Sequence, residues 1–385
     1  MSFSLQIIPK YYFGEAVVNQ HLVEELKHHQ VKTVLLAYGG GSIKRNGLYD
    51  EIVKACKQAK VKLVEHSGIE PNPRDVGIYQ AALTCRKYKV DLIIAAGGGS
   101  VIDAAKVIGI VATNPQYKDA WSYVMDSTKV TKPSIPLFSI ITLAATGSES
   151  NAGSVITNAK SHYKMPTGTP SATPLVCFED PKYTMTLSWW QTACGIFDIF
   201  SHLLEQYYDS KLFNWTKEYL LANMRVCLDC GKALKKNNQD YEARSNLLWT
   251  SSWALNGLGS FHGSFGDWMT HKLEHAVSGL WDVEHGAGLA LLTPYYLKYM
   301  VKHNKLFLQR SLEIGKAIFG VKTINEFFKS LDNFINLLGL PKKFTDFKQI
   351  NKVTNDDIKW LNNHFNKAIK GKAEMAKAVL DSVKR

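Results

Sequence analysis

The chain has 385 residues, of which 45% are hydrophobic and 21% charged, and its net charge is +12. This length favours two domains, because a single core stops growing at roughly 250–300 residues, and the composition excludes a disordered or fibrous chain. We interpret the positive charge as a solvated, lysine-rich exterior rather than a nucleic-acid or membrane surface. No run of about five like charges and no nucleic-acid-binding motif accompanies it.

Strand and helix signals alternate over residues 1–180. Short apolar runs predict strands at 4–14, 32–41, 61–68, 91–100 and 135–149. Apolar residues spaced three and four apart predict helices at 17–29, 48–60, 76–88 and 101–114. Strands without polar alternation, joined by helices, are typical of a parallel sheet covered on both faces. Residues 114–135 are expected to form a surface excursion.

The pattern changes near residue 181. From Leu187 onward the apolar residues recur at helical spacing, with little strand signal. We therefore expect an α/β domain with a parallel sheet over residues 1–180 and an all-α domain over residues 181–385.

The cysteines and the N-terminus indicate a cytoplasmic protein. Six cysteines are few for this length and fit a reducing compartment. Cys227 and Cys230 form a C-x-x-C pattern without a second pair, and we interpret them as buried thiols rather than as a zinc or redox site. The first residues are neither basic nor continuously apolar, so we expect no signal peptide. No apolar stretch reaches the ~20 residues of a membrane span.

Two glycine-rich turns each follow a predicted strand, namely Gly39-Gly40-Gly41-Ser42 and Gly97-Gly98-Gly99-Ser100. The second opens into a helix, whose free N–H groups and positive dipole end can bind a pyrophosphate. Glycine lets an anion approach the backbone closely. Neither turn is the G-x-G-x-x-G of the ordinary dinucleotide fingerprint. Two such turns at strand ends nevertheless favour phosphate binding over purely structural turns.

The first turn also bears on the choice of cofactor. Enzymes that bind NAD usually place an acidic residue near the adenine ribose, whereas a 2′-phosphate needs small donors or basic groups. The turn is followed by Ser42, Lys44 and Arg45, with no acidic residue before Asp50. This pattern favours NADP(H). A third polar turn, residues 142–151, offers hydroxyls for a phosphate or the nicotinamide ribose.

Five candidate metal ligands lie further along the chain: Asp198, His202, His271, His275 and His285. Asp198 and His202 are four apart, which places both side chains on one face of a helix. One carboxylate with two or three imidazoles suits Zn²⁺ or Fe²⁺, and ligand type alone does not separate the two ions. The segment HKLEH is not H-E-x-x-H, which disfavours a zincin protease. The spacing leaves open which of the five is not a ligand.

Four of these sequence segments resemble those of a known enzyme family. GGGSVIDAAK, TGSESNAG, GIFDIFSHLLEQY and HKLEHAVSGLWDVEHG are similar to the iron-containing (group III) alcohol dehydrogenase family over nearly the whole chain. YGGGSIKRNGLYDEI resembles its NADP-dependent butanol dehydrogenase branch. The resemblance implies a dehydroquinate synthase-like α/β domain and hydride transfer between NADP(H) and a small primary alcohol or aldehyde. It also implies Fe²⁺, or alternatively Zn²⁺, and a homodimer.

The resemblance also assigns site residues. It implies metal binding by Asp198, His202, His271 and His285, and it leaves His275 as a non-ligand near the nicotinamide. We expect a proton to reach the alkoxide product by way of water or His275, which makes His275 the candidate catalytic residue. The implied cofactor-binding residues are Gly40, Gly41, Ser42, Gly98, Gly99, Ser100, Asp103, Thr142, Thr146, Lys164 and Leu187. Asn151 is implied to border the substrate.

Two classes of alternative remain open from the sequence. One is another metalloenzyme of the same architecture, either a glycerol dehydrogenase or a dehydroquinate synthase-like lyase. The other, less favoured, is a basic nucleic-acid-binding protein with a structural zinc ion.

Overall fold

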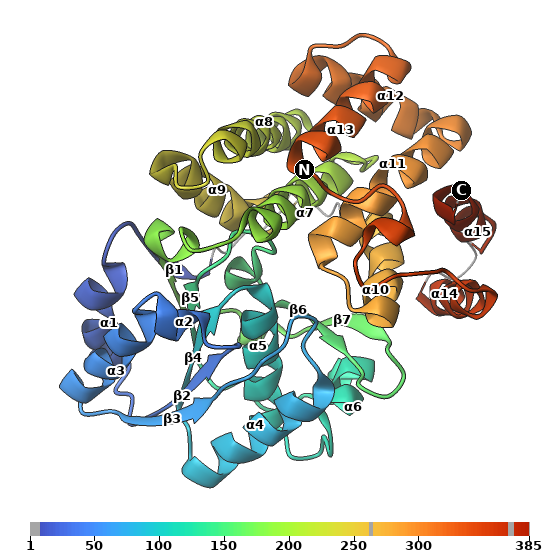
Figure 1. The fold of residues 1–385 in the computed structure, drawn as a ribbon. Coiled ribbons are helices and arrows are strands. Elements are labelled where there is room, and N and C mark those ends of the chain that lie inside the picture. Colours follow the sequence, from blue (N-terminus) through green and yellow to red (C-terminus); the bar gives the residue numbers. More distant parts are fainter. Residues whose placement is uncertain (1–7, 262–264, 369–372, 385) are drawn as a thin grey trace. The chain divides into compact units, whose positions relative to one another are not determined.

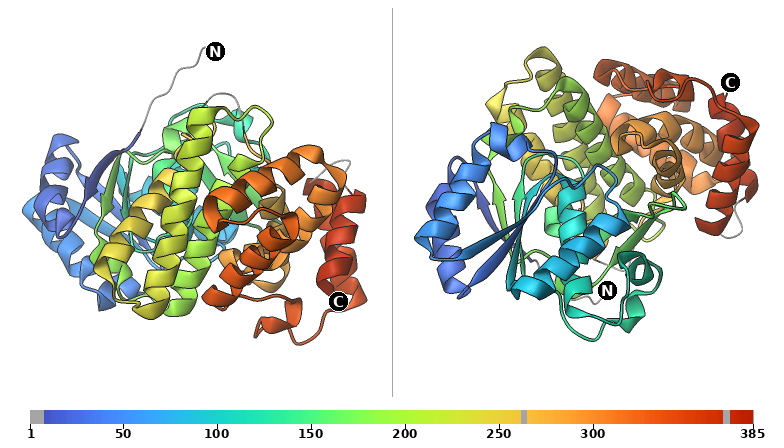
Figure 2. Two further views of the ribbon diagram at one scale, coloured as in Figure 1. Left: turned by 90° about the horizontal axis from the view of Figure 1, so that it is seen from above. Right: turned by 60° about the horizontal axis from the view of Figure 1, so that its bottom comes forward.

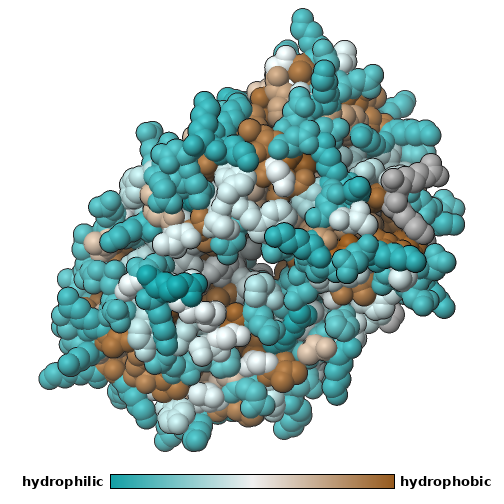
Figure 3. All heavy atoms as spheres, in the orientation of Figure 1, coloured by the Kyte–Doolittle hydropathy of each residue, from teal (hydrophilic) through white to brown (hydrophobic). Residues whose placement is uncertain are grey.

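The computed structural model describes residues 8–261, 265–368 and 373–384. Contacts divide the described chain into two compact units, of which the first ends at Leu187 and the second begins at Ser188. Among these residues, no helix combines the length and the apolar character needed to cross a bilayer. The face drawn in Figure 3 is mostly hydrophilic, with apolar side chains in separate patches.

The first unit contains a six-stranded parallel sheet with helices on both faces (Figures 1 and 2). The strand order is β1-β8-β5-β4-β2-β3, and each neighbouring pair is parallel. The strands are β1 (Lys10–Phe13), β2 (Thr33–Tyr38), β3 (Lys62–His66), β4 (Leu92–Gly97), β5 (Leu137–Ile141) and β8 (Val176–Glu179). The helices are α1 (Val17–His28), α2 (Ser42–Arg45), α3 (Leu48–Gln58), α4 (Asp75–Tyr88), α5 (Gly99–Thr113) and α6 (Ala120–Met125).

Two further strands, β6 (Gly153–Thr157) and β7 (Lys164–Gly168), form a separate antiparallel hairpin. Short helical turns occur at η1 (Ser127–Lys129), η2 (Ser148–Ser150), η3 (Pro170–Ala172) and η4 (Pro181–Thr184). The expected domain boundary at 180/181 falls at the start of η4, which belongs to the first unit.

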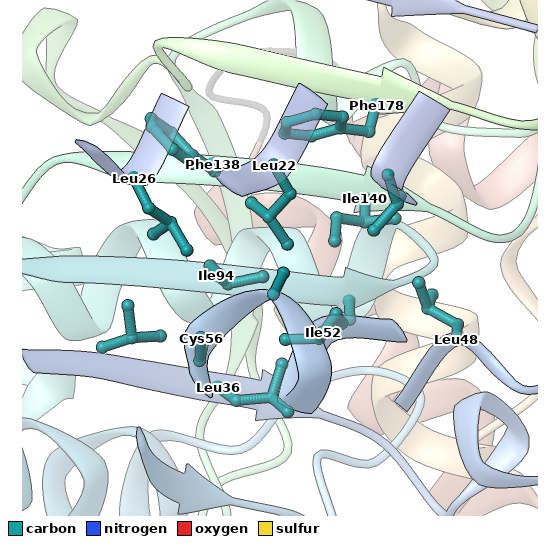
Figure 4. Packing of buried hydrophobic residues seen from close by; sticks show 14 of the residues in the cluster. Leu22, Leu26, Leu36, Leu48, Ile52, Cys56, Ile94, Phe138, Ile140 and Phe178 are labelled. Atoms are coloured by element: carbon teal, nitrogen blue, oxygen red, sulfur yellow. The ribbon is translucent and has the colours of Figure 1, made fainter. Parts of the chain in front are cut away.

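Both faces of the sheet carry apolar side chains that are covered by other parts of the unit. Successive side chains of a strand point to opposite faces, so Leu36, Ile94 and Ile140 share one face. They pack against Leu22 of α1 and Ile52 of α3 in one buried cluster (Figure 4). The intervening strand residues are buried as well. Burial on both faces explains why these strands appear in the sequence as continuous apolar runs.

The predicted fold class is confirmed by the parallel sheet and the helical second unit. The strands β6, β7 and β8 were not predicted from the sequence, and β7 carries a proline. The expected surface excursion at 114–135 in fact contains α6, which buries Ala120 and Tyr123. Part of the first predicted strand, residues 4–7, lies outside the described residues.

The described residues of the second unit form helices joined by loops (Figure 2). These are α7 (Trp189–Tyr207), α8 (Asn214–Lys236), α9 (Tyr241–Ala254), α10 (Met269–Trp281), α11 (His285–His303), α12 (Lys305–Ile314), η5 (Gly315–Phe319), α13 (Ile324–Leu338), η6 (Phe344–Asp346), α14 (Asn355–Ala368) and α15 (Ala373–Lys384). α7 begins with a capping box, in which Ser188 and Gln191 satisfy each other's backbone N–H groups. Cys227 and Cys230 are both buried free thiols on α8.

Candidate functional site

The two glycine-rich turns lie at the carboxyl ends of adjacent strands. β2 leads into Gly39–Ser42 and β4 leads into Gly98–Ser100, and the two strands pair directly. The chain passes from β2 outward to β3 and then returns to β4 on the other side of β2. Such a reversal of strand order is where open α/β sheets bind ligands. The sheet therefore brings both predicted phosphate-binding turns to one switch point.

The second turn packs against the third polar turn. Gly98 is the N-cap of α5, so the first N–H groups of the helix are available to an anion. A Cβ atom on Gly99 would lie 2.2 Å from Oγ1 of Thr146, so only glycine fits there. The backbone N–H of Thr142 donates to the carbonyl of Gly97 at 3.0 Å. These contacts bring together Gly98, Gly99, Thr142 and Thr146, which the family resemblance implies as cofactor-binding residues from separate motifs.

Asp103 and Lys106 connect α5 to the same polar turn. Asp103 accepts hydrogen bonds from the Ser148 hydroxyl at 2.5 Å and from the Val155 backbone N–H at 2.7 Å. The Lys106 ammonium donates to Ser148 at 2.8 Å and to the Gly153 carbonyl at 2.6 Å. Burial lowers the pKa of Lys106 to about 8, although the nearby carboxylate of Asp103 opposes the shift.

Three other predicted residues lie around this network. Asn151 accepts from the Gly153 backbone N–H at 2.8 Å and from Lys106 at 3.4 Å. Lys164 begins β7, where its buried ammonium donates to Oδ1 of Asn72 at 2.7 Å. Leu187 is the last residue of the first unit. The bonds of Asn151 and Lys164 fix their orientations within the first unit.

The fold places Glu65 beside the first turn, although this acidic residue lies more than 20 residues further along the chain. The hydroxyls of Tyr38 and Tyr49 each donate to the Glu65 carboxylate at 2.8 Å. The Lys44 ammonium lies over both tyrosine rings, 5.4 and 4.7 Å from their centroids. The parallel pairing of β2 with β3 places Glu65 beside Leu36, and this register explains how Glu65 comes near the first turn.

A pocket of about 220 Å³ also adjoins the first turn. Its lining includes His66, Ile69 and Arg74. The Gly68 backbone N–H donates to the carbonyl of Gly39 at 3.2 Å, which attaches the pocket wall to the turn.

Three helices of the second unit supply the candidate metal ligands. Asp198 and His202 lie on α7, His271 and His275 lie on α10, and His285 is the first residue of α11. Oδ1 of Asp198 lies 3.6 Å from Nε2 of His202 and 3.7 Å from Nε2 of both His271 and His285. The fold therefore brings the four predicted ligands together around one carboxylate oxygen.

The residues present fit a divalent ion. Ligand atoms at about 2.1 Å from a tetrahedral ion lie about 3.4 Å from one another, close to the separations from Asp198. Within the described residues, Oδ1 of Asp198 and Nε2 of His271 are buried without a hydrogen-bond partner. Such buried polar atoms require an explanation, and a bound cation provides one. By mutual distance the potential ligands form two groups, Asp198 with His202 and His271, and His285 with His275 and Glu274. His285 joins the two groups through its contact with Asp198, and its ring centroid lies 5.6 Å from that of His275.

The local backbone explains how α11 approaches the other two helices. Asp282, just after α10, adopts a left-handed conformation with φ 53°, which redirects the chain toward His285. A Cβ on Gly286 would lie 2.0 Å from the Cys194 carbonyl oxygen of α7. A Cβ on Gly288 would lie 2.7 Å from the carboxylate of Glu274. The glycines of the HGAG segment thus allow the close packing that brings His285 to the site.

Two carboxylates that the sequence analysis missed contact the candidate ligands. Glu205 lies 2.6 Å from Nδ1 of His271, and Glu274 contacts Nδ1 of His285. The signal was helical spacing, since Glu205 is seven residues beyond Asp198 on α7 and Glu274 is three beyond His271 on α10.

Burial and charge act in opposite directions on these groups. Burial disfavours an imidazolium, yet the carboxylates of Glu205 and Asp198 outweigh it and raise the pKa of His271 to about 10. Burial lowers the pKa of His202 to about 3, so its imidazole is a neutral potential ligand. Burial would also raise the pKa of Asp198, but the surrounding histidines hold it below its usual range.

One aromatic side chain contacts this group directly. Trp268 lies 5.2 Å from the ring centroid of His271 and 5.9 Å from that of His202. It adopts a left-handed backbone conformation with φ 53° immediately before α10. Strained backbone of this kind concentrates at functional sites. By contrast, the indole N–H of Trp189 donates to the Leu338 carbonyl at 3.1 Å, and the Trp281 ring packs against Phe344.

Comparison with known families extends these observations to the whole chain. Residues 9–181 match the iron-containing alcohol dehydrogenase family, and residues 192–383 match the C-terminal domain of the Fe-containing alcohol dehydrogenase family. The chain belongs to the iron-containing alcohol dehydrogenase family. This confirms the family predicted from the sequence motifs and makes the protein an NAD(P)-dependent oxidoreductase.

Curated members of the family are similar over most of their length. The chain is 37% identical over 358 residues to an NADH-dependent butanol dehydrogenase B of Clostridium acetobutylicum, covering 90% of this chain and 89% of that protein. It is 33% identical over 354 residues to the NADPH-dependent aldehyde reductase YqhD of Escherichia coli, with the same two coverages. The crystal structure of an NADH-dependent butanol dehydrogenase A from Thermotoga maritima matches with a TM-score of 0.90 and 31% identity, covering 100% of this chain and 99% of that one.

Proposed function

We propose that this protein interconverts small aldehydes and primary alcohols, using NADP(H) and a divalent ion, Fe²⁺ or Zn²⁺, held by Asp198, His202, His271 and His285. The observation that carries this proposal is the convergence of three imidazole Nε2 atoms on one buried carboxylate oxygen. The family includes butanol dehydrogenases and an aldehyde reductase by name, which supports a small aliphatic substrate.

The residues of the chain take separate roles in this reaction. A divalent ion supplies Lewis acidity, which polarises a carbonyl, and the nicotinamide supplies hydride. The two glycine-rich turns bind the phosphates, with Gly98 and Gly99 exposing the first N–H groups of α5. Asn151 borders the substrate. His275, next to His285, passes a proton to the developing alkoxide by way of water, for which imidazole is suited near neutral pH.

We further propose that NADP(H) is preferred. Two tyrosine hydroxyls donate hydrogen bonds to Glu65, an acidic group beside the first turn. Lys44 lies on the same short helix as Ser42, and its ammonium would supply the positive charge that a 2′-phosphate needs. Relatives named for NADH and relatives named for NADPH both occur, so cofactor preference has to be measured.

A cytoplasmic homodimer is likewise proposed, on the family resemblance of the motifs and on the cysteines. All six cysteines are free and buried, as suits a reducing compartment. Light scattering of the purified protein tests the dimer, and a monomer at micromolar concentration would contradict it.

The activity test uses metal-quantified protein with butanal and butan-1-ol, each with NADPH or NADH, followed at the absorbance of the reduced cofactor. We expect turnover with bound metal, and loss of both metal and turnover in Asp198→Ala and His271→Ala. His303→Ala is the matched control, because this exposed histidine lies at the far end of α11. Full turnover by metal-free Asp198→Ala would refute the proposal.

A further inference from the structure

Two buried carboxylates other than Asp198 contact the candidate metal ligands, and metal binding by the four ligands does not account for them. Glu205 and Glu274 are 4% and 0% exposed in their side chains. Burying a carboxylate is costly unless it is paired and hydrogen-bonded. The partners of these buried carboxylates are therefore informative, and in both cases they include the Nδ1 atom of a histidine whose Nε2 faces Asp198.

We propose that Glu205 and Glu274 are positioning residues that hold His271 and His285 in the tautomer with the proton on Nδ1, leaving each Nε2 lone pair directed at the metal. This inference rests on the proposed metal set. A histidine that donates from Nδ1 to a carboxylate cannot rotate its ring without breaking that bond, and its Nε2 becomes more basic.

Glu205 also fixes the helix that carries His271. Its Oε1 accepts from the Ser201 hydroxyl at 3.2 Å and pairs with His271. Its Oε2 accepts from the Thr270 backbone N–H at 3.0 Å, which satisfies one of the free N–H groups at the start of α10. A single side chain of α7 therefore sets both the position of α10 and the orientation of the His271 ring.

Glu274 performs the corresponding task for α11. It extends from α10 to the first residue of α11, where it contacts Nδ1 of His285. Gly288 lies against this carboxylate, and a Cβ there would be 2.8 Å from Cγ of Glu274. The three helices are thus connected in series, α7 to α10 through Glu205 and α10 to α11 through Glu274.

His202 provides an internal contrast. Within the described part of the chain, its Nδ1 is buried without a hydrogen-bond partner. Its ring instead stacks on His271, with centroids 4.7 Å apart and planes 19° from parallel. The histidines of α10 and α11 thus each have a carboxylate at Nδ1, whereas His202 is oriented by its own helix and by stacking on His271.

The test measures Zn²⁺ affinity of the full-length protein by competition with a chromophoric chelator. Glutamine has one acceptor oxygen, so Glu205→Gln cannot serve both His271 and Thr270. We expect Glu205→Gln and Glu274→Gln each to weaken Zn²⁺ binding by about 10- to 100-fold. Glu313→Gln is the matched control, because that carboxylate of the same unit accepts from Tyr207 and Arg310 instead of from a histidine.

Two further measurements separate positioning from general stability. The d–d absorption bands of the Co²⁺-loaded variants should shift from those of the wild type, while Glu313→Gln keeps the wild-type spectrum. Histidine ¹⁵N NMR of the Zn²⁺-loaded wild type should show protonated Nδ1 atoms at His271 and His285, and this measurement needs no variant to fold. Bare Nδ1 atoms, or unchanged Zn²⁺ affinity and Co²⁺ spectra in both glutamine variants, would overturn the inference. A wild type that binds no metal would instead refute the metal set itself, and the inference with it.

Discussion

The buried lysine of α5 should make the stability of the protein depend on pH. Lys106 is 1% exposed, and its pKa falls from 10.5 to about 8 on folding, because burial disfavours the charged form and Asp103 offsets this only in part. Below pH 8 the lysine is charged in both states, and the unfavourable burial of the ion is fully present. Between pH 8 and 10.5 the unfolded state binds more protons than the folded state, so this contribution to stability rises with pH.

The magnitude follows from the size of the shift. A difference of one pKa unit corresponds to about 1.4 kcal/mol, so the lowered pKa of Lys106 corresponds to a destabilisation of the folded state by about 3 kcal/mol at neutral pH. About 2 kcal/mol of this destabilisation disappears between pH 7 and 9.5 as the folded protein loses the proton of Lys106. Other groups also titrate in this range, so the wild type is compared with Lys106→Met. The free energy of unfolding from urea titrations, without metal or cofactor, should rise in the wild type relative to the variant by about 2 kcal/mol over that interval.

A constant difference between the two proteins across pH 7 to 9.5 would refute this reasoning. It would mean that Lys106 keeps an ordinary affinity for protons inside the fold. A difference that decreased with pH would show that the ion pair with Asp103 outweighs burial, reversing the sign of the shift.

Three further predictions concern Lys44 after the first glycine-rich turn, His275, and the packing of α11. Lys44→Ala should raise KM for NADPH about tenfold more than KM for NADH, through loss of a charge-assisted contact worth about 1.5 kcal/mol; equal changes for both cofactors would contradict that role. His275→Ala should keep stoichiometric metal while lowering kcat by about 10²-fold or more, and loss of metal in this variant would make His275 a ligand instead. Gly286→Ala should lower both the metal affinity and the melting temperature, because the new Cβ would lie 2.0 Å from the Cys194 carbonyl oxygen and cost about 1–3 kcal/mol. Gly77→Ala, where nothing lies within 4 Å of an added Cβ, is its control.

Much of the fold could be predicted from the sequence because local signals were strong. The strands at β2 and β4 are continuous apolar runs that end in glycines, and their neighbours have clear helical spacing. The hairpin β6–β7 was missed because neither strand is a continuous apolar run and β7 carries a proline. The four-residue strand β8 was missed because its pairing with β1 and β5 depends on distant segments. The expected excursion at 114–135 failed for the same reason, because the burial of α6 depends on tertiary packing.

The sequence by itself determined the kinds of chemistry that the protein carries. Two glycine-rich turns and a carboxylate with several histidines can be recognised from residue type and spacing alone, since helix periodicity already puts Asp198 and His202 on one face. Only the tertiary structure decided which groups meet across elements. It directed His271 and His285 to the same oxygen of Asp198, and it placed Glu205 and Glu274 behind those two rings. Such contacts depend on how helices pack, and the spacing of residues along one helix does not contain that information.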